Sequence, residues 1–290
     1  CGTTQQPSLV FDENDFIEVF IDEVNTANPQ TNIALGPQNI GSTTWSGASW
    51  SNGVSDRTRN AVINGTYNAT DGSFGACDLT VNGNLNFNSG TSNYVEVNDN
   101  LTISGTFTIG DQESLYSVDA TNPGGNTVTI SGSITKFETT TSLTDVNDYT
   151  YWSSPVQGQN ISSVFAPGVY NQGRLYYWDQ SKANVIPGGG SETLGEWIPA
   201  AGQTMEEGRG YISQGPISGS YPLQANVRFT GKPNNGDISF TLDGNTYGEV
   251  ADGWNLLGNP YPSAIDMTSF LTSNNASITV LPVTNIFSSE

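Results

Sequence analysis

The sequence contains no histidine. Histidine is the usual general base of Ser-His-Asp and Cys-His catalysis and a common ligand of zinc and iron, so these centres are excluded in their ordinary form. Only two cysteines are present, Cys1 and Cys77, and two cysteines supply neither a disulfide framework nor a tetrahedral metal cage. Cys77 lies beside a β-type run, and we expect it to point into a core as a small apolar side chain.

Basic residues are also scarce, because 8 Lys and Arg stand against 28 Asp and Glu, for a formal net charge of −20. Nucleic acids and anionic membranes both require a basic surface, so neither is an expected partner. No apolar run approaches the roughly 18 residues that a membrane-spanning helix needs, and no transmembrane segment is predicted. Such acidity favours solubility and can concentrate divalent cations.

Strong helix formers are few, and charged residues make up only 12% of the chain. The polarity comes instead from Asn, Thr, Ser and Gly, which favour turns and exposed strand faces. The composition therefore predicts an all-β protein with little helix.

Four stretches of the first half repeat one pattern: a short β-type run, then Asn or Ser, then Gly, then a second alternating run. They are residues 61–67, 79–85, 101–107 and 128–134. Their glycines are 18, 22 and 27 residues apart, which suits a solenoid coil of two or three short strands better than the hairpins of a flat meander. We expect each glycine to turn the chain at a corner by adopting a positive φ.

This repeat predicts a short right-handed parallel β-helix over residues 43–144. Trp45 and Trp50 are interpreted as a cap on its open end, and a sugar-stacking platform is the alternative. Residues 1–42 are interpreted as an extended acidic arm, since residues 1–30 carry six acids and no basic residue. The β-prone runs within residues 1–30 favour self-association by strand addition.

Near residue 145 the composition changes, and aromatic residues and prolines become frequent. Strand-like runs, separated by Gly and Pro at spacings of roughly 10 to 20 residues, predict an antiparallel β-sandwich of jelly-roll character over residues 145–290. This half also contains an internal duplication, in which residues 149–155 align with residues 254–260.

Three aromatic residues of the second half, Tyr176, Trp178 and Trp197, are candidate carbohydrate-binding residues, since aromatic rings combine a large apolar face with a polar edge. The run 176–178 must send side chains to both faces of a strand, so at least one ring is expected to face outward. The alternative places most of these rings in the core.

Calcium is the one cofactor considered, because Asx-rich loops gather the oxygen ligands that it prefers. The candidate ligands are Asp12, Asn14, Asp15, Asp145, Asn147 and Asp148. Their spacing does not match an EF-hand, and Asx turns without metal are the alternative.

Two pairs of carboxylates could in principle support glycosidase chemistry, Glu206 with Glu207 and Asp111 with Glu113. We interpret them as solvated surface acids and predict that the chain is not an enzyme.

The segment 253–266, Gly-Trp-Asn-Leu-Leu-Gly-Asn-Pro-Tyr-Pro-Ser-Ala-Ile-Asp, resembles a signature of large secreted and cell-surface proteins of Bacteroidota, which are typically exported by the type IX secretion system. The motifs at 151–156, 176–179, 208–211 and 229–236 follow in the order expected of the same family. The solenoid-like run resembles what precedes this module in such proteins, so the resemblance covers residues 43–275.

The resemblance implies an extracellular or outer-surface location and a non-catalytic adhesin-type role, because the family includes adhesins, gliding-associated surface proteins and accessory regions of polysaccharide-degrading enzymes. It carries no catalytic residues to this chain. A carbohydrate-binding accessory module and a structural subunit of a surface filament are the alternatives. Polysaccharide and other surface proteins are therefore the expected partners.

The chain departs from this family in two ways, both at its C-terminal end. It stops at Glu290, before the expected C-terminal sorting domain, and residues 278–283 replace an expected aromatic strand. Cys1 is interpreted as the trimmed end of a longer chain, with a lipid-anchored cysteine as the alternative.

Overall fold

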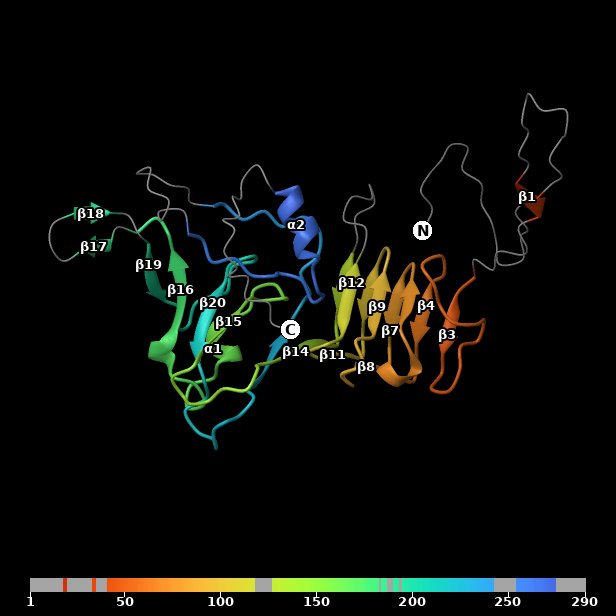
Figure 1. The fold of residues 1–290 in the computed structure, drawn as a ribbon. Helices are drawn as coiled ribbons and strands as arrows, with labels where there is room; N and C mark the ends of the chain where they lie inside the picture. The colour runs from red at the N-terminus through yellow and green to blue at the C-terminus, as the bar shows by residue number, and fades with distance from the viewer. Residues whose placement is uncertain are drawn as a thin grey trace, which may run out of the picture.

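The computed structural model consists mainly of β-strands (Figure 1). It describes residues 41–117, 127–182, 195–242 and 254–274, together with the backbone of 18–19, 33–34, 184–186 and 190–192. The prediction of little helix is confirmed for these residues, whose helical segments are α1 (Ile161–Val164), α2 (Met267–Ser273) and the 3₁₀ turns η1 (Ala69–Asp71) and η2 (Gln172–Arg174). None of the helices described is long and apolar enough to cross a membrane.

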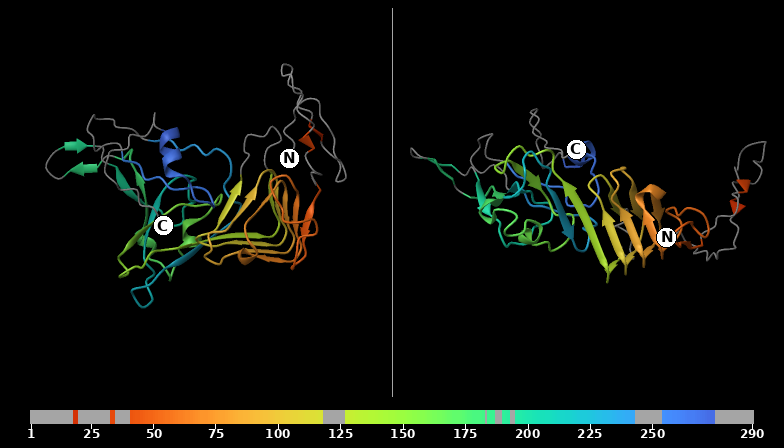
Figure 2. Two further views of the ribbon diagram at one scale, coloured as in Figure 1. Left: turned by 45° about the vertical axis from the view of Figure 1, so that its right-hand side comes forward. Right: turned by 90° about the horizontal axis from the view of Figure 1, so that it is seen from below.

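The first half forms a β-solenoid of about four turns with three sheets (Figure 2). The first sheet contains β3 (Thr43–Trp45), β4 (Ala61–Ile63), β7 (Leu79–Val81), β10 (Leu101–Ile103) and β13 (Val128–Ile130). The second contains β5 (Thr66–Asn68), β8 (Asn84–Phe87), β11 (Thr106–Ile109) and β14 (Ser133–Thr139). The third contains β6 (Phe74–Ala76), β9 (Tyr94–Val97) and β12 (Ser114–Ser117). Successive coils pair in parallel, which confirms the solenoid over the meander.

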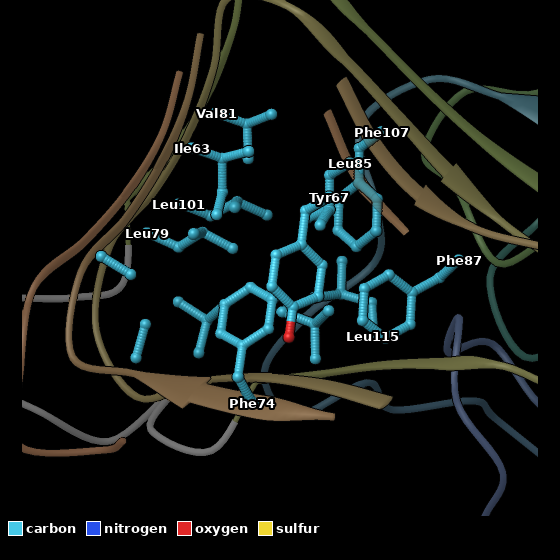
Figure 3. Packing of buried hydrophobic residues seen from close by; sticks show 14 of the residues in the cluster. Ile63, Tyr67, Phe74, Leu79, Val81, Leu85, Phe87, Leu101, Phe107 and Leu115 are labelled. Carbon is cyan, nitrogen blue, oxygen red and sulfur yellow. The ribbon is translucent and has the colours of Figure 1, made fainter. Parts of the chain in front are cut away.

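Alternation along each strand sends one row of side chains inward, where the rows of the three sheets meet in one core (Figure 3). Each inward residue stacks on its equivalent in the next coil, as Leu85 does between Tyr67 and Phe107. Outward Asn and Thr side chains bond between coils, and Asn82 Nδ2 donates to Asn64 Oδ1 at 2.9 Å. Stacking between coils thus requires equivalent residues at equivalent positions, both on the inward face and on the outward face of each sheet. This requirement explains the sequence repeat.

Aromatic side chains close the N-terminal end of this core. Trp45 is buried, and its ring packs edge-on against those of Trp50 and Tyr67, with centroids 5.7 and 4.8 Å away. The Trp45 Nε1 donates to Thr66 O at 2.8 Å, which satisfies a polar group that burial would otherwise penalise. Both tryptophans pack against the core, as the cap interpretation requires.

The repeat glycines form the corner between the first two sheets, but not for the reason that the sequence analysis gave. None of the four has a positive φ. They are stacked so closely that no Cβ fits: one on Gly105 would lie 1.9 Å from Gly83 O, and one on Gly132 would lie 1.9 Å from Gly105 O. This approach lets the amides of Ser104 and Gly105 share Val81 O at 2.8 and 2.9 Å. The prediction of positive φ is wrong, because coil-to-coil contact is what requires glycine.

The second half is built on a four-stranded antiparallel sheet in the order β15 (Tyr149–Trp152), β20 (Tyr211–Gln214), β16 (Leu175–Asp179) and β19 (Glu196–Pro199). One face of this sheet packs on a buried cluster that includes Trp152, Phe165 and Leu175. Two short antiparallel pairs are separate from it, β17 (Asn184–Ile186) with β18 (Gly190–Glu192) and β1 (Glu18–Val19) with β2 (Ile33–Ala34). The second sheet that a sandwich needs is not among the described residues. The predicted self-association through residues 1–30 likewise falls outside the described residues, except for the backbone of β1.

The two copies of the predicted duplication share a helix cap but not a strand. Asn160 Oδ1 accepts from Ser162 N at the start of α1, and Asp266 Oδ1 accepts from Ser269 N at the start of α2, both at 2.9 Å. The first copy forms β15, whereas the second pairs through an isolated bridge at Leu257. The sequence similarity between the two copies therefore reflects a shared turn and helix cap rather than a shared strand.

The two halves share one sheet. β21 (Asn226–Thr230) pairs antiparallel with β14, along the edge that ends the second sheet of the solenoid. At the third sheet, Leu115 N of β12 donates to Pro262 O at 3.0 Å. An open sheet edge invites pairing with other chains, and the second half covers two such edges at this end of the solenoid.

A buried charge marks the junction. Lys136 is the Cα partner of the inward residue Ile109, and its ammonium group donates to Gly110 O at 2.5 Å and to Asp111 O at 3.1 Å. It also pairs with Glu138 Oε1 at 3.1 Å. Burial raises the pKa of Glu138 to about 7, although the charge of Lys136 acts in the opposite direction. One group at the junction therefore titrates near neutral pH.

Gly105→Ala is expected to destabilise the solenoid, because the new methyl group meets a backbone carbonyl that cannot move without shifting a coil. Overpacking of this kind costs about 3 kcal/mol, and urea unfolding followed by circular dichroism measures it. Gly231→Ala is the matched control, since its φ is also not positive and its Cβ meets nothing nearer than 3.5 Å. Equal midpoints for the two variants would contradict the contact explanation.

The carboxyl group of Glu138 is expected to make the free energy of unfolding fall between about pH 5 and about pH 7. Its raised pKa means that the folded chain keeps a proton that the unfolded chain, at an ordinary value of 4.5, has released. The full shift corresponds to about 3 kcal/mol, and we expect less because 31% of the side chain is exposed. Glu138→Gln should flatten the slope in urea titrations at the two pH values; an unchanged slope would refute this assignment.

Candidate functional site

Aromatic side chains gather on one face of the four-stranded sheet. Directly paired residues of an antiparallel sheet point to the same side, and the register joins Tyr151 to Ile212 and Ile212 to Tyr176. The same register pairs Trp178 with Trp197. We call the aromatic residues on this side the aromatic face; they are Tyr149, Tyr151, Tyr176, Trp178 and Trp197.

The intervening residues of the same strands point the other way, into the core. Trp152 is buried, and its Nε1 donates to Ser213 Oγ at 2.9 Å. On the aromatic face, by contrast, Tyr149, Tyr151 and Trp197 keep 40%, 43% and 38% of their surface exposed. Strand alternation therefore separates the aromatic residues that stabilise the fold from those that meet solvent.

Trp178 is held in one orientation. Its Nε1 donates to Trp254 O at 3.0 Å and to Gln180 Oε1 at 3.2 Å. Its ring lies against Gly195, where an added Cβ would be 2.4 Å from the indole and where φ is +78°. The ring of Trp197 packs against it edge-on, with centroids 5.3 Å apart and planes at 70°. The two indole rings are thus held in a fixed arrangement by their neighbours.

Arg209 supports the same corner of the sheet. Its Nε donates to Glu206 Oε2 at 2.7 Å, and its Nη1 donates to Trp178 O at 3.2 Å. The guanidinium group lies over the ring of Tyr177, 4.8 Å from the centroid, a favourable cation–π position. Behind Tyr177 stands Tyr211, whose pKa burial raises. Trp178 is therefore fixed to the core as well as to its neighbours on the face.

The structure brings together the three residues that the sequence analysis selected, Tyr176, Trp178 and Trp197, and leaves all three at least partly exposed. The alternative of a core position is wrong for them. Sequence reasoning missed Tyr149 and Tyr151 as members of the same surface. The period of two in residues 149–152 is the signal that places both opposite the buried Trp152.

The calcium prediction concerns two loops, of which one is described. Outside the described residues lie Asp12, Asn14 and Asp15. In the described loop, Asp148 Oδ2 accepts from Thr144 N and Oγ1 at 2.5 and 2.8 Å, and Asp145 Oδ1 accepts from Asn147 N at 2.5 Å. The two bonds from Thr144 lower the pKa of Asp148, and the bonds together account for the turn. Calcium binding stays a prediction.

A further group of potential ligands lies at a corner of the solenoid. The Sγ of Cys77 and carboxylate oxygens of Asp78 and Asp99 are within 4.8 Å of one another. Cys77 is buried, as predicted, but its sulfur takes part in a disulfide bond and offers no thiolate. Asp78 Oδ1 accepts from the backbone and side-chain amides of Asn100 at 3.1 and 2.9 Å. The group is therefore explained by hydrogen bonds between coils.

Two of the acids that the sequence analysis weighed as catalytic pairs, Glu206 and Glu113, make contacts of their own with other residues. Glu206 is exposed and bound to Arg209, as a surface acid should be. Glu113 is only 1% exposed, and its Oε1 accepts from Ser89 N and Thr91 N at 2.9 and 3.1 Å. The surface interpretation of Glu113 is wrong, because the side chain is buried, where two backbone donors from the preceding coil satisfy Oε1 while Oε2 has no hydrogen-bond partner among the described residues.

Gly195→Ala is expected to displace the ring of Trp178, because the new methyl group would overlap the indole. Gly202→Ala is the matched control: its φ of +76° carries the same backbone strain, but nothing lies within 4 Å of its Cβ. Tryptophan fluorescence should shift to longer wavelength and become easier to quench by iodide in Gly195→Ala alone. Identical spectra for the two variants would show that Gly195 does not position the ring.

Comparison with known proteins gives one family and no individual relative. Residues 40–284 match the model of a family described as Domain of unknown function (DUF8693). No curated protein and no solved structure matches the chain. The matched residues include the solenoid, the shared sheet and the whole aromatic face. Because the match covers most of its length, the chain belongs to the family Domain of unknown function (DUF8693).

Proposed function

We propose that this chain is a non-catalytic adhesion segment of an extracellular bacterial surface protein, and that its aromatic face binds polysaccharide. The observation that carries the proposal is the gathering of five aromatic residues on one side of one sheet, three of them at least 38% exposed. Contiguous apolar surface on a soluble domain is characteristic of an interaction site. Aromatic rings suit sugars because a sugar ring, too, has apolar faces and polar edges.

The shape of this surface favours an extended polymer over a small molecule. Pockets for small molecules are concave and measure roughly 300–1,000 Å³. The hollow beside Trp178 and Arg209 has a volume of only about 20 Å³. Strand spacing puts Tyr151 and Tyr176 about 10 Å apart with Ile212 between them, a distance that successive rings of one polysaccharide chain can cover.

The charge of the chain indicates which polysaccharides the aromatic face can bind. The net charge of −20 repels anionic polymers at long range, while the rings of the aromatic face are uncharged. Arg209, which lies beside Trp178, is already paired with Glu206 at 2.7 Å. A neutral polysaccharide is therefore the ligand class that fits.

The resemblance of residues 253–266 supports the biological setting. It favours an outer-surface location and export by the type IX secretion system in a Bacteroidota species. In this proposal the solenoid, with right-handed coils, acts as a stiff spacer, and the second half, with a jelly-roll sandwich, presents the ligand-binding face.

Trp178→Ala and Trp197→Ala are each expected to weaken binding more than tenfold, since truncation of a central aromatic anchor costs about 2 kcal/mol. Affinity electrophoresis in gels that contain xylan, mixed-linkage β-glucan or galactomannan measures the effect. Trp197→Phe, which keeps a ring, should retain most of the affinity. Val54→Ala, at an exposed solenoid position, should bind like the unmodified chain. Full retardation of both tryptophan-to-alanine variants would refute the proposal.

A separate measurement tests the proposal that the chain is not an enzyme. Incubation with the same polysaccharides should release no reducing ends. Turnover that disappears in Glu206→Gln would overturn this part, whatever the electrophoresis shows.

A further inference from the structure

The outer face of the third solenoid sheet carries a second pair of exposed aromatic rings. Tyr94 on β9 and Tyr116 on β12 keep 48% and 47% of their surface exposed. Tyr116 is the Cα partner of Glu96, which follows Tyr94 by two positions, so all three point outward. Strand spacing and rise place the two tyrosines roughly 8 Å apart on a diagonal, with Glu96 beside both.

Arg57 crosses this face because the neighbouring strand has no side chain there. Gly75 of β6 is the Cα partner of Glu96, and an added Cβ on Gly75 would lie 3.1 Å from Arg57 N. Arg57 Nε reaches Glu96 Oε2 at 2.8 Å, and this contact raises the pKa of Arg57. Glu96 is left only 5% exposed, whereas 63% of the Arg57 side chain remains exposed.

The polar groups of this cluster are held in place, but not all of their hydrogen-bonding capacity is used. The ion pair with Glu96 is made by Nε of Arg57, and most of the Arg57 side chain remains exposed to solvent. Within the described residues, the buried Glu96 Oε1 has no hydrogen-bond partner. An unsatisfied buried carboxylate oxygen is costly and calls for an explanation in function or strain.

We infer that Tyr94, Tyr116, Arg57 and Glu96 form a second saccharide-binding site, on the wall of the solenoid. The tyrosine rings cover the apolar faces of the sugar, the terminal N–H groups of Arg57 donate to hydroxyl oxygens, and Glu96 Oε2 orients Arg57 through its Nε. The ion pair is neutral overall, so the ligand is a neutral saccharide. For its ligand class this inference rests on the proposed function of the aromatic face.

Two sites on one scaffold make the chain bivalent. The aromatic face belongs to the four-stranded sheet and the tyrosine site to the third solenoid sheet, and the β14–β21 pair ties the two halves together. Binding at one site raises the effective concentration of the same polymer at the other. A polysaccharide is therefore held more tightly than by either site alone, or two polymers are cross-linked.

The test separates the two sites by paired variants. Tyr94→Ala with Tyr116→Ala removes the solenoid site, and Trp178→Ala with Trp197→Ala removes the aromatic face. We expect calorimetry with xylohexaose, cellohexaose or mannohexaose to give two equivalents per unmodified chain and one for each double variant. Affinity electrophoresis in the matching polysaccharide should show a loss of at least about tenfold for each double variant, because avidity is lost.

Conservative variants guard against trivial loss of fold. Tyr94→Phe with Tyr116→Phe keeps both rings and should bind nearly as well as the unmodified chain. Arg57→Lys keeps the charge but loses the planar fork of donors, and should weaken the solenoid site about tenfold in the Trp178→Ala, Trp197→Ala background. Circular dichroism should show all variants folded.

Each outcome distinguishes this inference from the proposed function. If the Trp178→Ala, Trp197→Ala variant binds nothing, the solenoid site is refuted and the aromatic face stands. If that variant binds normally while the Tyr94→Ala, Tyr116→Ala variant does not, the solenoid site stands and the proposed function of the aromatic face fails. If the unmodified chain binds none of these saccharides, both are refuted.

Discussion

The pairing of β14 with β21 is the interaction on which the rest of the structure depends. Each coil of a parallel solenoid satisfies its backbone groups through the next coil, so the last coil presents an open edge. β21 runs antiparallel to β14 and therefore cannot act as one more coil. Lys136 also stands on β14, at an inward position where the preceding coil has Ile109. A buried ammonium group cannot stack as an apolar residue can, so charge and strand direction both end the repeat at the same strand.

The same strand pair joins two hydrophobic cores. Ile134 of β14 belongs to the core of the solenoid, whereas Val227 and Phe229 of β21 belong to the core of the second half. The second half also meets the solenoid where Pro262 O accepts from Leu115 N at 3.0 Å. Within the second half, the buried Asn234 holds the neighbouring Pro260 in place, because its Nδ2 donates to Pro260 O at 2.8 Å and to Ser154 O at 2.9 Å. The segment 253–266 therefore has a structural task at the junction of the two halves.

Sequence patterns predicted what depends on local periodicity and missed what depends on distant partners. The four repeats predicted parallel coils, because stacking demands equivalent residues at equivalent positions. The corner glycines were placed correctly but explained wrongly, since a glycine required by positive φ and one required by close contact look alike in a sequence. Glu113 was misjudged because its donors, Ser89 and Thr91, come from the preceding coil. For the aromatic face, alternation told which side chains share a side. Alternation could not predict which side of the sheet is exposed to solvent, because exposure depends on the segments that cover the sheet.

Two arginines are paired with glutamates beside the two surfaces proposed to bind saccharides. Arg209 lies beside Trp178 and Arg57 lies beside Tyr94 and Tyr116, and each guanidinium group is bound through Nε to one glutamate, at 2.7 and 2.8 Å. Such a contact fixes a planar donor group at little entropic cost and cancels its charge locally. The remaining acids still create a negative field, which salt screens beyond roughly 8 Å. Under the proposed function, anionic polymers are repelled at a distance, while a neutral ligand that reaches either surface meets aromatic rings rather than net charge.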